Sequence, residues 1–395
     1  VYKRQGIAED EIEEKLKSLS DEFMAQRATK LGIKIFRTAE KSLLLQVLDQ
    51  QWKEHLQALE QLRQSIGLRA YGQKDPLNEY KREAFILFEQ MLQNLRTVIT
   101  SVLSHLEVQQ EKEDVKTVEI KKIVKALETS DGAGVKLKRS IGTPKADYID
   151  PFLMLDEFGS ENSEDYIAGF PPHPHRGIET VTYMLAGDFE HKDSTGGQGR
   201  MTAGDVQWVK TGSGIIHSEM PEQENGRLAG FQLWVNLPAS DKLCDPAYRE
   251  YPKDQIPLEN YAQGVEVRVI TGVTHHGTTG PISGVVTKPL YLDVNMSPEA
   301  SFEEFIPQGQ AGYVFDIEGE ISVRSDTHSK TISTGQLGVL GPGNAVHIES
   351  SASSARFLLV AAQVLDGPIA RYGPFVMNTR AEIEQAITDL NAGKF

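Results

Sequence analysis

The chain has 395 residues, of which 39% are hydrophobic and 25% are charged, which is typical of a folded soluble protein rather than a disordered one. This length predicts two or three domains, no apolar run approaches the ~18 residues of a membrane helix, and the single cysteine, Cys244, excludes both an internal disulfide framework and a multi-cysteine zinc site. A net charge of −15 argues against nucleic-acid binding as the main task, and we expect a cytoplasmic protein.

The composition changes near residue 110. Residues 1–110 hold 16 Lys+Arg, 16 Asp+Glu, four Gly and one Pro, whereas residues 111–395 hold 25 Lys+Arg, 40 Asp+Glu, 30 Gly and 17 Pro. Because Gly and Pro mark turns and avoid helix interiors, we predict a helical part followed by a strand-rich part. The predicted boundaries are a short N-terminal extension at 1–5, helices at 6–108, a linker at 109–117, and two β domains at 118–255 and 256–395.

Two amphipathic stretches, at residues 38–66 and 79–106, predict a long helical hairpin. Their apolar side chains, which include Trp52 and Phe88, recur at steps of three, four and seven and therefore share one helix face. Residues 67–76 carry Gly72 and Pro76 and predict the turn, with Tyr71 at its tip. The simplest interpretation is a packing or dimerisation hairpin.

The segments LDQQWKEHL (48–56), LRQSIGLRAY (62–71), QKDP (73–76) and EYKRE (79–83) resemble the helical scaffold of SecA, the ATPase motor of bacterial protein export. The resemblance covers residues 6–108. It implies that the turn is the tip of a two-helix finger, that Tyr71 matches the aromatic side chain touching the moving polypeptide, and that the Sec channel is a candidate partner. No G-x-x-x-x-G-K-[ST] loop occurs in the sequence, so we expect no ATPase activity.

The first five residues, VYKRQ, are what a common sequencing-transposon end encodes when it is translated in frame. We therefore interpret residues 1–5 as library-derived sequence, with the reading frame truncated upstream.

From residue 118 onward, short β-rich runs separated by turn residues predict a sandwich or barrel. The clearest predicted strands are 179–185, 205–209, 230–235, 265–270, 289–294, 312–317 and 356–360. Two blocks share one layout, in which a strand ends at Gly187 or Gly319 and a later turn carries Gly204 or Gly335, and this indicates two β-barrel repeats. Residues 380–390 predict a C-terminal capping helix. The expected fold class is therefore multidomain, α followed by all-β.

Four candidate metal ligands occur in the first repeat. His173 and His175 stand at i and i+2, as do His217 and Glu219, so in extended strands each pair faces one side. Two such pairs on neighbouring strands could converge as a three-His, one-carboxylate site with about two open positions on an octahedral ion. Ligands of this kind without thiolate suit Fe(II), Mn(II), Ni(II) or Cu(II) better than zinc. The second repeat offers only a lone His347, so we expect it to be metal-free.

Five segments resemble pirins, which are two-domain members of the cupin superfamily: DPFLMLDEF (150–158), FPPHPHRGIETV (170–181), QWVKTGSGIIHSEMP (207–221), LWVNL (233–237) and GPFVMN (373–378). The resemblance runs from about residue 118 to 395 and implies a bicupin fold. It implies one iron in the first cupin, held by the residues that match His173, His175, His217 and Glu219. It also implies either quercetin 2,3-dioxygenase activity or the role of a redox-dependent transcription cofactor.

Three functions compete on these observations. The first is an Fe(II) dioxygenase that cleaves a small flavonol-like aromatic, with Glu219 as the general base. The second is a non-catalytic regulator whose metal reshapes a surface for a protein partner. The third is an export-associated protein attached through the SecA-like fragment. The residues present favour the dioxygenase over the non-catalytic regulator only modestly.

Other titratable residues have simpler interpretations. Glu179 stands four residues after His175, where many other cupins keep their carboxylate ligand, and we expect it to support an imidazole rather than bind the metal. The remaining histidines of the strand-rich part are expected at the surface or in hydrogen bonds: His191, His275, His276, His328 and His347. His55 and His105 are expected on solvated helix faces.

Overall fold

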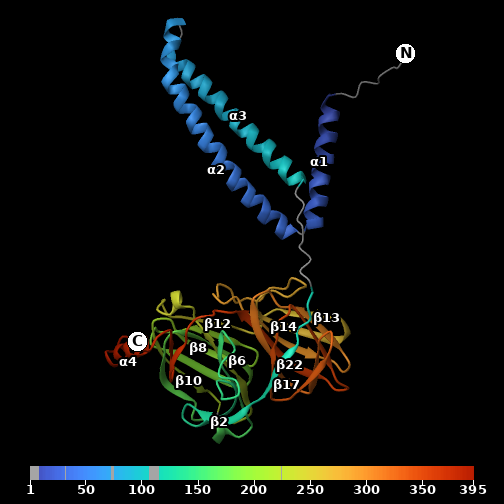
Figure 1. Cartoon of the computed structure of the whole chain (residues 1–395), viewed down its shortest axis with the longest axis vertical. Helices are drawn as coiled ribbons and strands as arrows, with labels where there is room; N and C mark the ends of the chain where they lie inside the picture. Colours follow the sequence, from blue (N-terminus) through green and yellow to red (C-terminus); the bar gives the residue numbers. More distant parts are fainter. Residues whose placement is uncertain (1–8, 32, 73–74, 106–114, 224) are drawn as a thin grey trace, which may run out of the picture. The chain divides into compact units, whose positions relative to one another are not determined.

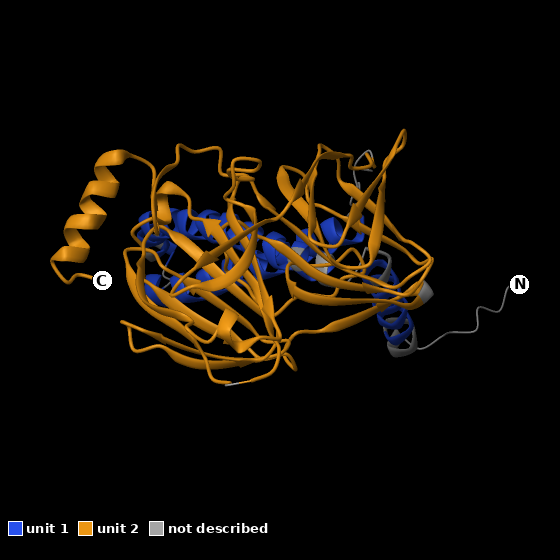
Figure 2. Ribbon diagram, turned by 90° about the horizontal axis from the view of Figure 1, so that it is seen from below, with its two compact units in different colours: residues 1–113 blue, residues 114–395 orange. Residues whose placement is uncertain are grey.

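The computed structural model describes residues 9–31, 33–72, 75–105, 115–223 and 225–395 (Figure 1). The chain divides into two compact units, residues 1–113 and 114–395 (Figure 2), and each is considered by itself. Residues 1–5 and most of the predicted linker lie outside the described residues. Within the described part, no helix is both long enough and apolar enough to cross a membrane.

The first unit is helical and contains the predicted hairpin. Its elements are α1 (Glu9–Leu31), α2 (Ile33–Ser65), the 3-10 turn η1 (Ile66–Gly72) and α3 (Pro76–His105). Helix α3 begins where the sequence supplies a start signal, because Pro76 has no N–H group that would need an acceptor there and the Asp75 carboxylate accepts a hydrogen bond from the Leu77 amide at 2.9 Å. Tyr71 lies in η1. Its side chain is outside the described part, so its place at the exposed tip stays a prediction.

One histidine of the hairpin is not where the sequence predicted it. His55 is buried, with its ring centroid 5.6 Å from that of Trp52 and 5.8 Å from that of Phe88 on the facing helix. The expected solvated face is therefore wrong for His55, because imidazole is amphipathic and packs against aromatic rings as readily as it faces water. His105 is exposed as expected.

The second unit consists of two β-barrels, each built from a seven-stranded and a four-stranded sheet. In the first barrel the strand orders are β12-β9-β6-β11-β4-β3-β2 and β5-β10-β7-β8. Its elements are β2 (Leu127–Asp131), β3 (Val135–Ile141), β4 (Phe152–Ser160), η2 (Ser163–Asp165), β5 (Phe170–His175), β6 (Ile178–Ala186), β7 (Asp188–Asp193), β8 (Gln198–Thr202), β9 (Val206–Lys210), β10 (Ile215–Pro221), β11 (Leu228–Asn236), η3 (Ala239–Asp241) and β12 (Ala247–Tyr251).

The second barrel repeats this layout with the strand orders β1-β20-β17-β22-β15-β14-β13 and β16-β21-β18-β19. Its elements are β1 (Ile120–Lys125), β13 (Leu258–Tyr261), η4 (Ala262–Gly264), β14 (Val265–Thr271), β15 (Leu290–Met296), β16 (Ser301–Phe305), β17 (Gln310–Glu318), β18 (Glu320–Arg324), β19 (Ser329–Ser333), β20 (Gln336–Leu340), β21 (Ala345–Ser350) and β22 (Ala355–Gln363). The two predicted barrels are therefore present, in the order expected.

The two barrels exchange their terminal segments. Strand β1 precedes the first barrel in sequence but pairs antiparallel with β20 of the second. The C-terminal segment, β23 (Ala370–Tyr372), β24 (Phe375–Met377) and α4 (Arg380–Asn391), returns to the first barrel, where Val376 packs with Ile178 and Trp234. An ion pair of 2.9 Å joins Arg176 to Asp389 of α4. A division at 255/256 therefore does not separate the barrels as they are built.

Strand alternation decides which side chains of β6 reach the site. Val181 and Tyr183 belong to a core that also contains Tyr313 and Phe315 of the second barrel, so this face of β6 is covered by the neighbouring barrel. Because successive side chains of a strand point to opposite faces, Thr182 faces the interior of the first barrel. That interior holds the candidate metal centre.

Candidate metal centre

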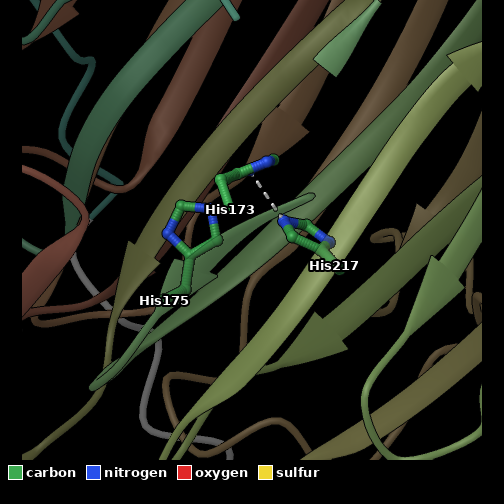
Figure 3. Close-up of side chains that lie close together, drawn as sticks. All are labelled: His173, His175 and His217. Carbon is green, nitrogen blue, oxygen red and sulfur yellow. Dashed lines mark hydrogen bonds between the residues drawn. The ribbon is translucent and has the colours of Figure 1, made fainter. Parts of the chain in front are cut away.

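Three of the predicted ligands meet between two adjacent strands of the four-stranded sheet. β5 and β10 are antiparallel with His173 directly opposite His217. The Nε2 atoms of these two rings are 3.1 Å apart (Figure 3), and the His175 ring centroid lies 4.8 Å from that of His173 and 5.0 Å from that of His217. The three imidazoles offer nitrogens that all lie within 4.8 Å of one another, which is close enough to share one ion.

Backbone groups orient two of these imidazoles. The Nδ1 atom of His173 is 2.8 Å from the Pro171 carbonyl oxygen, and that of His175 is 3.3 Å from the Pro374 carbonyl oxygen. A carbonyl only accepts hydrogen bonds, so Nδ1 carries the proton in both rings and Nε2 presents its lone pair. Burial lowers the pKa of His175 to about 3 and that of His217 well below its ordinary value, and nearby imidazoles add to both shifts. Neutral imidazole is the form that binds a metal.

A glycine makes the turn that follows the two histidines of β5. Gly177 has a φ of +82°, and a Cβ atom at this position would come within 2.1 Å of the Val376 carbonyl oxygen. Only glycine satisfies both demands, so the returning C-terminal segment can pack directly against the end of the β5–β6 connection.

Glu219 lies beside the three histidines but is held separately. Its Oε1 atom accepts hydrogen bonds from Thr182 Oγ1 at 2.8 Å and from Gln207 Nε2 at 3.0 Å, while Gln232 Nε2 lies 3.5 Å from Oε2. Glu219 groups within 4.8 Å with His217 and His191 rather than with all three predicted histidine ligands. The carboxylate is therefore anchored through Oε1, and the weakly bonded Oε2 is the atom available to an ion or a proton.

His191 is the residue of this centre that sequence reasoning placed with the uninvolved histidines. It is completely buried, its ring stacks on Tyr248 at 4.4 Å, and its ring centroid lies 5.3 Å from that of His217. His191 Nε2 is 3.0 Å from Asp193 Oδ2, so the expected hydrogen bond is present. The signal in the sequence was a second H-x-acid pair, His191 and Asp193, on the strand that pairs with the His217–Glu219 dyad.

Glu179 does not support an imidazole, in contrast to the sequence-based expectation. It lies on the face of β6 that carries Val181 and Tyr183, opposite to the Thr182 face, and is paired across the sheet with Lys210. Carbonyl groups take the orienting role at His173 and His175. Glu179 holds the position after His175 where many other cupins keep their carboxylate ligand, but the connection between β5 and β6 places it on the strand face that points away from the imidazoles.

Replacing Glu179 with glutamine should make the free energy of unfolding less dependent on pH. Burial raises the pKa of this carboxyl group from 4.5 to about 7, so the folded protein resists an ionisation that the unfolded chain undergoes freely. The wild type therefore loses stability as the pH rises from about 4.5 to about 7. Above that range the contribution of Glu179 to the free energy of unfolding no longer changes with pH. Near pH 8 the variant should be more stable by up to about 3 kcal/mol.

Chemical denaturation of the metal-free protein at pH 4.5 and at pH 8 measures this effect. Glu266→Gln, at an exposed position of β14, is the matched control and should change neither value. An equal stability difference between Glu179→Gln and wild type at both pH values would contradict the assignment.

A cavity of about 610 Å³ opens onto the centre. His173, His175 and Glu219 lie in its wall, and aromatic side chains form much of the remaining surface: Phe158, Phe170, Phe189 and Trp234. Four further charged side chains line it as well: Asp131, Arg139, Asp156 and Arg371. Cavities of this size and largely apolar lining suit a small organic ligand.

The donor set fits a divalent transition metal. Three neutral imidazoles and a carboxylate without thiolate are ligands that Fe(II), Mn(II), Ni(II) and Cu(II) accept. Among the described residues, both groups of side chains that could hold an ion lie in the first barrel, at His173, His175 and His217 and at His191, His217 and Glu219. The two groups share His217, so they describe one centre.

Comparisons with known protein families agree with this architecture. Residues 134–235 match the family model "Pirin", and residues 291–395 match "Pirin C-terminal cupin domain". Residues 1–107 match "SecA Wing and Scaffold domain". That match includes residues 1–5, for which a library origin stays a prediction.

Individual relatives cover the second unit almost completely. A pirin-like protein of Caulobacter vibrioides is 47% identical over 274 residues, which are 69% of this chain and 98% of that protein. Human pirin is 40% identical over 275 residues, or 69% of this chain and 91% of the human protein. A crystal structure of quercetin 2,3-dioxygenase from Acinetobacter baumannii has a TM-score of 0.64 at 30% identity and covers 71% of this chain and 98% of its own.

Proposed function

Because the chain belongs to the pirin family, we propose that its first barrel is the metal-dependent active site of an oxygenase of the quercetin 2,3-dioxygenase type. The observation that carries this proposal is the placement of His173, His175 and Glu219 in the wall of one aromatic-lined cavity. The family alone does not imply catalysis. The cavity supplies the missing element, because it can hold an aromatic ring against the ligand cluster.

The metal, for which Fe(II) is our first choice and Mn(II), Ni(II) or Cu(II) the alternatives, would supply Lewis-acid and oxygen chemistry when bound. His173, His175 and His217 would hold the metal. Glu219 would either bind the metal as a fourth ligand or remain beside it without binding. Among the described residues, Glu219 Oε2 accepts one long hydrogen bond, from Gln232 Nε2 at 3.5 Å, so this atom can take a proton from a substrate hydroxyl. Thr182 and Gln207 keep the carboxylate in place through Oε1 while it does so.

Anaerobic reconstitution with each of the four metals, followed by oxygen-uptake measurements with quercetin and 3-hydroxyflavone, tests the proposal. Uptake that requires both metal and flavonol supports it. A protein that binds one metal per chain yet consumes no oxygen with any flavonol would favour the alternative of a regulator that binds a protein partner. Contact with the Sec channel rests on the match over residues 1–107 alone and is tested by cross-linking from the η1 turn.

Replacing His191 with phenylalanine should weaken metal binding by about tenfold or more. His191 belongs to the group of candidate ligands that includes His217 and Glu219, and its Nε2 atom is held by Asp193 Oδ2 at 3.0 Å. Phenylalanine keeps a ring that can stack on Tyr248 but removes both ring nitrogens, so the polar surroundings of the His217 imidazole are lost. Loss of a residue that supports a metal ligand typically weakens metal affinity by about 10–100-fold.

Metal titration of the folded variant measures this loss. Tyr248→Phe is the matched control, because it keeps the ring that stacks on His191 and removes only the hydroxyl group that donates to Glu250. If His191→Phe bound the metal as tightly as Tyr248→Phe, His191 would be a packing residue only.

A further inference from the structure

The cavity has a cationic side chain on the wall formed by the returning C-terminal segment. Arg371 of β23 lines the cavity, and its guanidinium carbon lies over the Trp234 ring at 5.3 Å from the ring centroid. The Trp234 ring in turn meets the His175 ring edge to face at 5.0 Å. Since both distances share the Trp234 ring, the guanidinium carbon is at most about 10 Å from the His175 ring.

Among the described residues, Arg371 has no carboxylate partner. Its Nη1 atom donates only to the Leu153 carbonyl oxygen, at 3.3 Å. The second arginine of the cavity, Arg139, is neutralised by Asp156, with Nε–Oδ1 and Nη2–Oδ2 distances of 2.7 Å each, and by Asp131 at 2.9 Å. Arg371 is an exposed residue overall; burial of part of its side chain and repulsion from Arg139 lower its pKa, while the Asp147 and Asp156 carboxylates act in the opposite direction.

We propose that Arg371 is an anion-binding subsite of this cavity and that the preferred ligand is a planar aromatic carboxylate. One end of such a ligand carries the oxygen atoms that meet the metal-ligand cluster, and its carboxylate lies at the far end against the guanidinium. The planar guanidinium group of Arg371, whose carbon lies over the Trp234 ring, carries a fork of donors that matches a carboxylate. This inference rests on the proposed function only because it places the ligand in the same cavity.

Two matched ligands test it: 3-hydroxyflavone and its 4′-carboxylate, which carries the charge at the end remote from the chelating oxygens. Calorimetric titration of the iron-loaded full chain without oxygen gives both dissociation constants without turnover. The wild type should bind the carboxylate about tenfold more tightly than the neutral parent, as one charge-assisted contact implies. Arg371→Gln should abolish this preference and leave the affinity for 3-hydroxyflavone unchanged, and Arg371→Lys should restore part of it.

Arg200→Gln is the control, because Arg200 lies on β8, pairs with Asp188 and does not line the cavity. An undiminished preference in Arg371→Gln, or an equal loss of affinity for both ligands, would overturn the proposal. A preference that depends on Arg371 in a protein that consumes no oxygen would sustain the subsite and reject the oxygenase. Flavonol turnover without any preference for the carboxylate would support the oxygenase and reject the subsite.

Discussion

Alanine in place of His217 should reduce the metal content from one equivalent per chain to a small fraction of one. His217 belongs to both groups of candidate ligands, so its removal leaves two histidines on β5 and a carboxylate that is anchored elsewhere. Metal binding also stabilises the folded state, so the metal-dependent increase in melting temperature should disappear with it. Elemental analysis after reconstitution and desalting, together with thermal unfolding with and without metal, measures both effects.

His347→Ala is the matched control for this variant. His347 is half-buried on β21 of the second barrel and lies 3.6 Å from Glu303, away from the candidate ligand groups. The His347→Ala protein should retain the full metal content. A wild-type protein with two ions per chain, or a His217→Ala protein with one tightly bound ion, would contradict the single centre.

Glutamine in place of Glu219 should lower the rate of flavonol-dependent oxygen uptake by about 10²–10⁴-fold, the usual contribution of a general base. The substitution keeps the size of the side chain and leaves an oxygen that can still accept from Thr182 and Gln207, so the local structure should survive. Three imidazoles remain, and metal binding should therefore fall much less than the rate. The comparison of metal content with turnover separates the two roles.

Glu179→Gln serves as the control for Glu219→Gln, because both remove a buried carboxylate from the first barrel and only one of them lines the cavity. The Glu179 variant should turn over at the wild-type rate. Equal losses in both variants would assign the effect to stability, and a fully active Glu219→Gln protein would remove Glu219 from the chemistry.

Local pattern in the sequence was enough to predict the helices and the two barrels and to propose four of the five side chains that gather at the candidate centre. Steps of three and four residues predicted α2 and α3, and short runs with glycine turns predicted the two barrels. The spacing of His173 and His175, and of His217 and Glu219, has the two-residue period of a strand, so each pair shares a face wherever the strand lies. These inferences succeed because they depend on neighbours within a few residues.

The tertiary structure decided what depends on distant segments. Strand pairing brought His191 to the His217–Glu219 strand, and the position of β6 turned Glu179 away from the imidazoles. The C-terminal segment supplied the Pro374 carbonyl oxygen that orients His175 and the Arg371 guanidinium that caps Trp234. No local period encodes such contacts, because they arise from cross-strand register and from which barrel the chain ends join. The amino-acid sequence by itself thus determined the fold class and indicated four candidate ligands, whereas packing between remote segments added His191 and determined the supporting groups and the shape and charge of the cavity.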